Sequence, residues 1–105
     1  MGDKKVDVLL VDDNREFCHL LKDYLDKSEN FEVVGMAHNG NDGLEEIKEK
    51  EPDVLILDLI MPHLDGIGVM EEMNELELAS EIKTIVLTAF GQEDITKRVV
   101  ELGAN

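Results

Sequence analysis

Four oxygen-bearing side chains directly follow short apolar segments of this sequence, where they could bind a metal ion or accept a phosphoryl group. Asp12 and Asp13 follow VDVLLV, Asp58 follows VLIL, and Thr88 follows TIVL. Each segment has the length and the β-branched content of a buried strand. In open α/β sheets, ligands bind beyond the carboxyl ends of parallel strands, so these side chains are expected to converge there.

Three carboxylates at one edge of a sheet repel one another, and a divalent cation would relieve that repulsion. The set contains oxygen ligands without His or Cys, which favours a hard ion such as Mg²⁺, or otherwise Ca²⁺ or Mn²⁺. A carboxylate can also attack phosphorus, which would make Asp58 the acceptor of a phosphoryl group. The Thr88 hydroxyl could then donate a hydrogen bond to a phosphoryl oxygen.

Each of these residues also has a simpler explanation when taken alone. Asp12 and Asp13 could complement the dipole of the helix that follows them. Asp58 could be a turn residue, and Thr88 an ordinary residue at a strand end. Only their coincidence at three strand ends favours a shared site.

Hydrophobic periodicity predicts strands that alternate with helices along the chain. The predicted strands cover residues 6–11, 31–37, 53–57 and 84–87. The predicted helices place these residues on their apolar faces: Phe17, Leu20, Leu21, Tyr24 and Leu25; Leu44 and Ile47; Ile67, Met70, Met73 and Leu76; Ile95, Val99, Val100 and Leu102. Asn39-Gly40 is predicted as a turn, and Gly103 as a helix C-cap. The alternation predicts a doubly wound α/β sandwich with a parallel sheet.

Composition limits the classes of function. The chain has 105 residues, which predicts one domain, and a formal net charge of −15, which would repel nucleic acid. It has no apolar run long enough to span a membrane and no signal peptide, so a cytoplasmic location is expected. The single cysteine, Cys18, is expected as a buried filler. His19, His38 and His63 are expected at the surface or in structural roles.

The segments VLLVDDN, VLILDLIMPHLDG and IVLTAFG, in this order, resemble the receiver (CheY-like) domain of bacterial two-component response regulators. The resemblance covers essentially the whole chain. It implies a flavodoxin-like fold with strand order 2-1-3-4-(5). The runs MPHLDG and TAFGQEDITK resemble, more narrowly, response regulators of the sporulation phosphorelay.

The resemblance also implies a role for each site residue. Asp58 would be the phosphoacceptor, Asp13 a direct metal ligand, and Asp12 a ligand acting through a water. The backbone carbonyl of Ile60 would complete the metal site, and Thr88 would be the switch hydroxyl. The chain would then be a phosphorylation switch, not a multiple-turnover enzyme.

The implied partners follow from the same resemblance. The phosphoryl donor would be a phosphohistidine on a histidine phosphotransfer protein or a sensor histidine kinase. The receiver would regulate a C-terminal DNA-binding domain that controls transcription.

In one respect the sequence departs from the family pattern. That pattern continues past Gly103-Ala104 into a fifth strand, a Lys-Pro pair and a fifth helix, whereas this sequence ends at Asn105. We therefore expect residues 1–105 to form a receiver domain that is incomplete at its C-terminal end and lacks the pocket lysine. The exposed sheet edge would favour a dimer or an exchange of segments.

Three alternatives remain open on the sequence. One is a small phosphatase with an aspartyl nucleophile. Another is a flavin- or nucleotide-binding sandwich, although two carboxylates after the first strand would repel a phosphate. The third is a stand-alone receiver that acts through protein partners.

Overall fold

Four parallel strands form one sheet in the computed structural model, which describes residues 5–59, 66–77, 81–87 and 101–103. The strands are β1 (Val6–Val11), β2 (Phe31–Ala37), β3 (Val54–Asp58) and β4 (Lys83–Leu87), and their order in the sheet is β2-β1-β3-β4. Helices α1 (Arg15–Asp26), α2 (Gly40–Lys50) and α3 (Gly66–Glu75) connect them. The predicted α/β sandwich and its strand order are confirmed.

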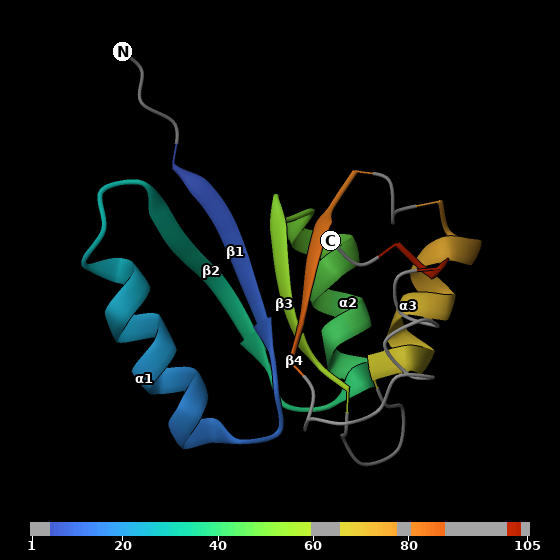
Figure 1. Cartoon of the computed structure of the whole chain (residues 1–105), viewed down its shortest axis with the longest axis horizontal. Coiled ribbons are helices and arrows are strands. Elements are labelled where there is room, and N and C mark those ends of the chain that lie inside the picture. Colours follow the sequence, from blue (N-terminus) through green and yellow to red (C-terminus); the bar gives the residue numbers. More distant parts are fainter. Residues whose placement is uncertain (1–4, 60–65, 78–80, 88–100, 104–105) are drawn as a thin grey trace.

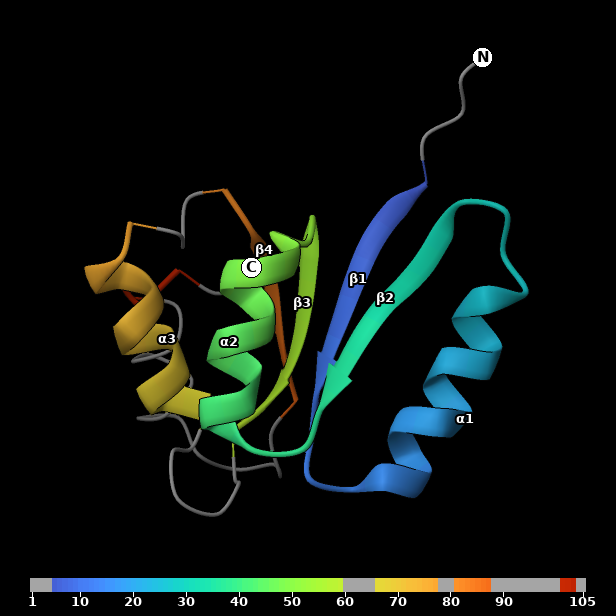
Figure 2. The same cartoon turned by 180° about the vertical axis from the view of Figure 1, so that it is seen from behind.

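The helices lie on both faces of the sheet. Helix α1 covers one face, whereas α2 and α3 cover the other (Figure 1). Figure 2 shows the same separation from behind. All the strands run in one direction, so their carboxyl ends share one edge. Ile95, Val99 and Val100 of the predicted fourth helix lie outside the described residues. Its predicted end is described: Leu102 is buried, and Gly103, predicted as the C-cap, has a φ of 109°.

Asparagine side chains begin the first two helices. Asn14 accepts a hydrogen bond from the backbone N–H of Phe17 at 3.0 Å and caps α1. Asn39 accepts from the backbone N–H of Asp42 at 2.8 Å and caps α2. Such caps satisfy backbone donors that the first helical turn leaves unpaired. The predicted turn at Asn39-Gly40 is therefore wrong, because Gly40 is already helical.

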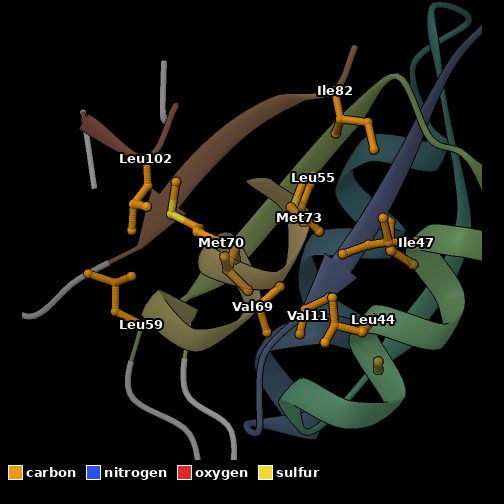
Figure 3. Packing of buried hydrophobic residues seen from close by; sticks show 13 residues of the cluster. Val11, Leu44, Ile47, Leu55, Leu59, Val69, Met70, Met73, Ile82 and Leu102 are labelled. Atoms are coloured by element: carbon orange, nitrogen blue, oxygen red, sulfur yellow. The ribbon is translucent and has the colours of Figure 1, made fainter. Parts of the chain in front are cut away.

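The larger hydrophobic core lies between the sheet and helices α2 and α3 (Figure 3). Its members are Leu9, Val11, Ala37, Leu44, Ile47, Leu55, Leu57, Leu59, Val69, Met70, Met73, Ile82 and Leu102. The prediction of Leu44, Ile47, Met70 and Met73 as inward-facing is confirmed. Leu76, however, is 45% exposed, because α3 ends at Glu75.

The smaller core lies under α1, and it corrects two predictions. Cys18 is the buried residue of α1, whereas Leu20 and Tyr24 are 64% and 73% exposed. The strand β3 is not buried equally on both faces. Leu55 and Leu57 are fully buried. Val54 and Ile56 face the α1 side and are only half-buried, because α1 packs against β1 and β2.

Candidate metal and phosphoryl site

The register of the sheet brings three carboxylates together. Val11, the last residue of β1, pairs with Leu57 of β3. The next residues along the two strands, Asp12 and Asp58, therefore emerge side by side. One oxygen each from Asp12, Asp13 and Asp58 lies within 4.8 Å of the others. The predicted convergence of the three acids is confirmed.

The structure holds the Asp12 side chain in place. Asp12 is only 9% exposed, and its Oδ1 accepts a hydrogen bond from the backbone N–H of Asn14 at 2.9 Å. Asn14 in turn caps α1. The turn between β1 and α1 is thus fixed at both ends, and Asp13 lies inside it. Asp13 is exposed and Asp58 is half-buried, so the cluster opens toward solvent.

Two further side chains contact the backbone carbonyl oxygen of Asp12. The imidazole Nδ1 of His38 lies 2.9 Å from the Asp12 carbonyl oxygen. The Cys18 thiol lies 3.5 Å from the same oxygen and donates to it. Burial raises the pKa of the Cys18 thiol, and the negative charge of Asp12 raises this pKa further. The thiol therefore stays protonated at neutral pH and remains a hydrogen-bond donor.

Gly66 lies against the backbone of Asp58 and Leu59. A Cβ at this position would lie 2.6 Å from the Leu59 Cα and closer still to the backbone oxygen of Asp58. The Gly66 N–H donates to the Leu59 carbonyl at 3.0 Å. The start of α3 therefore rests directly on the backbone that carries Asp58, and only glycine leaves space for this approach.

The three carboxylates fit a hard divalent cation. Their oxygens belong to three different residues and are close enough to contact one ion. Mg²⁺ is typically bound by one or two carboxylates together with waters and phosphate oxygens, so a cluster that opens to solvent suits it. The same opening would admit a phosphoryl group to Asp58.

Two of the predicted site residues, Thr88 and Ile60, lie outside the described residues. The residue before Thr88, Leu87, pairs with Asp58 in the sheet. The sequence argument missed the contacts of Cys18 and His38 with the Asp12 backbone. The strand register of the structure brings them about: Ala37 pairs with Val11, so the residues that follow them, His38 and Asp12, are neighbours.

The sequence profile of the response regulator receiver domain family matches residues 8–105. The chain belongs to this family. Among the described residues of this receiver domain, no helix has the length and the apolar character needed to cross a membrane.

Several solved structures superpose on nearly the whole chain. The response regulator domain of CheB from Thermotoga maritima is 30% identical, with a TM-score of 0.86 over 96% of this chain and 75% of that chain. The signal receiver domain of NarL from Mycobacterium tuberculosis is 33% identical, with a TM-score of 0.87 over 96% of this chain and 80% of that chain. A chain of the CheX–CheY–BeF3–Mg²⁺ complex from Borrelia burgdorferi is 27% identical, with a TM-score of 0.84 over 95% of this chain and 74% of that chain.

Proposed function

We propose that this receiver domain is a phosphorylation switch in which Asp58 accepts a phosphoryl group. The observation that carries the proposal is the gathering of Asp12, Asp13 and Asp58 within 4.8 Å. Family membership supports it, because receiver domains bind Mg²⁺ through such an acidic cluster. The similar chain from Borrelia burgdorferi belongs to a complex with BeF3 and Mg²⁺, which supports the same assignment.

Each acid has a separate task in this proposal. Asp13 and Asp58 would hold a divalent ion directly, Asp12 would hold it through a water, and the Ile60 carbonyl would be a further ligand. Such an ion would supply positive charge beside the phosphoryl oxygens. The protein's contribution to phosphoryl transfer is chiefly this positioning and charge neutralisation.

The transfer itself uses one carboxylate oxygen of Asp58 as the nucleophile. This oxygen forms a bond to the phosphorus of a phosphohistidine, and the P–N bond breaks. The donor imidazole keeps the electron pair of the broken bond. The product is an aspartyl phosphate, whose oxygens the Thr88 hydroxyl then contacts. That hydrogen bond exists only in the phosphorylated state, so it can shift the balance between two conformations.

The partners follow from this chemistry. The donor is a histidine phosphotransfer protein or a sensor histidine kinase. The receiver carries the signal to a DNA-binding effector that controls transcription, and it undergoes one phosphorylation for each signal instead of turning over a substrate. A receiver that acts only through protein partners would accept phosphate equally well but would leave transcription unchanged.

Labelling of the acceptor tests the proposal. The chain is treated with acetyl phosphate and Mg²⁺, and the modified residue is mapped by mass spectrometry. The wild-type chain and an Asp23→Asn control, which alters an exposed acid of α1, should gain one phosphoryl group. Asp58→Asn should gain none. Labelling of Asp58→Asn, or of a residue other than Asp58 in the wild type, would reject the assignment.

We further propose that the switch serves a sporulation phosphorelay. The support is the pair of runs MPHLDG and TAFGQEDITK. Phosphotransfer from a purified phosphotransfer protein of a sporulation phosphorelay should be much faster than transfer from one of an unrelated two-component system. Equal rates from the two donors would remove this narrower proposal and leave Asp58 as the acceptor.

A further inference from the structure

The end of β2 contacts both backbone polar groups of Asp12, the residue that joins β1 to the acidic cluster. The Asp12 N–H donates to the carbonyl oxygen of Ala37 at 3.0 Å. The Asp12 carbonyl oxygen lies 2.9 Å from His38 Nδ1. Ala37, the last residue of β2, thus holds the N–H of Asp12, and His38, the next residue, holds its carbonyl oxygen. The first contact is ordinary sheet pairing, but the second depends on the type of side chain at position 38.

The acceptor in the second contact fixes the state of the imidazole. A carbonyl oxygen can only accept a hydrogen bond, so Nδ1 of His38 must carry the proton. The Cys18 thiol donates to the same oxygen at 3.5 Å and lies 4.0 Å from Nδ1. This carbonyl oxygen therefore has two side-chain donors, one from α1 and one from the end of β2.

We propose that His38 is a positioning residue for the metal site. Its Nδ1–H orients the Asp12 carbonyl and so fixes the plane of the peptide group that joins Asp12 to Asp13. The inference rests on the proposed function, because it concerns how the same acidic cluster is held ready for Mg²⁺. His38 does not contact the ion in this arrangement and acts only through the backbone.

The physical argument is the free energy that Mg²⁺ binding must spend to order a mobile ligand. Asp13 is exposed, and it lies in a turn that leads into the Asn14 cap of α1. If the Asp12 carbonyl lost the His38 donor at 2.9 Å, only the longer contact from the Cys18 thiol at 3.5 Å would hold it. The peptide between Asp12 and Asp13 could then rotate more freely, and Mg²⁺ binding would have to order it. Groups that orient metal ligands are commonly worth about 10- to 100-fold in metal affinity.

Paired variants separate the hydrogen bond from the shape of the ring. His38→Phe keeps a planar ring but has no donor, whereas His38→Asn places an amide N–H near the position of Nδ1. Calorimetric titration with Mg²⁺ should show about ten-fold weaker binding for His38→Phe and nearly wild-type binding for His38→Asn. His19→Phe makes the same exchange at an exposed position of α1 and should leave the affinity unchanged.

The outcomes distinguish a failure of the positioning role of His38 from a failure of the proposed function. If the wild-type chain does not bind Mg²⁺, the proposed function fails. If the wild type binds and His38→Phe binds equally well, or His38→Asn is weakened as much as His38→Phe, only the positioning role is overturned.

A measurement on the wild-type chain needs no variant to fold. Long-range ¹H–¹⁵N correlation spectra at pH 8 report which ring nitrogen of each histidine carries the proton. His38 should be protonated at Nδ1, whereas exposed His19 provides the internal comparison. Protonation of His38 at Nε2 would contradict the inference, because Nδ1 would then have no hydrogen to donate.

Discussion

Replacing Gly66 with alanine should damage both the fold and the site, because this glycine touches the backbone that carries Asp58. The new Cβ would lie 2.6 Å from the Leu59 Cα, which is 0.8 Å short of an ordinary contact at 3.4 Å. The obstacle is main chain at the end of a buried strand, so it cannot rotate away. Gly66 does not have a positive φ, so lack of space is the whole reason for the expected cost.

The magnitude follows from that shortfall. Overpacking of a buried contact typically costs about 1–3 kcal/mol, and we expect about 2 kcal/mol for Gly66→Ala. For a chain of this size, such a loss lowers the melting temperature by about 10 °C. A misplacement of about 1 Å can slow a reaction on the order of 100-fold. Because part of the strain relaxes elsewhere, we expect labelling of Asp58 to slow by about ten-fold.

Gly35→Ala is the matched control for this experiment. A Cβ at Gly35 would meet the Glu46 Oε1 at 2.6 Å and the Leu9 Cδ1 at 3.2 Å. Both are the ends of side chains that can move, so the cost should stay below about 1 kcal/mol. Thermal unfolding by circular dichroism and labelling by acetyl phosphate measure the two effects. If Gly66→Ala melted and labelled like Gly35→Ala, the steric reasoning would be refuted.

Three other predictions concern the parts that support the site. Ile47→Ala should lower the free energy of unfolding in urea by about 3 kcal/mol, because Ile47 is fully buried; a loss below that of Ile47→Val would contradict the packing. Asn14→Ala should cost about 1 kcal/mol through the lost cap, whereas Asn14→Ser should retain most of the stability in the same assay. The raised pKa of Cys18 means that folding disfavours its thiolate. Stability is therefore full below the ordinary thiol pKa and declines as the pH rises above it. The decline should be absent in Cys18→Ala, and alkylation of Cys18 at pH 8 should be slower in the native than in the unfolded chain.

The sequence by itself determined the elements of this protein and the edge on which its chemistry lies. The apolar segments that end at Val11, Leu57 and Leu87 read as strands, and their alternation with helices required parallel pairing. Parallel strands share one carboxyl edge, so Asp12 and Asp58 could be placed together before any coordinates. These features depend on periodicity and chain direction, which are local properties of a sequence.

Only the tertiary structure decided which side of each helix or strand faces the core and which segments meet. The spacing that predicted α1 placed Tyr24 on its apolar face, but the helix turns Cys18 toward the sheet and Tyr24 away from it. The contacts of His38 with Asp12 and of Gly66 with Asp58 depend on how separate segments approach one another. The physical reason is that periodicity fixes which residues can share a face, whereas strand register and helix rotation fix which atoms meet.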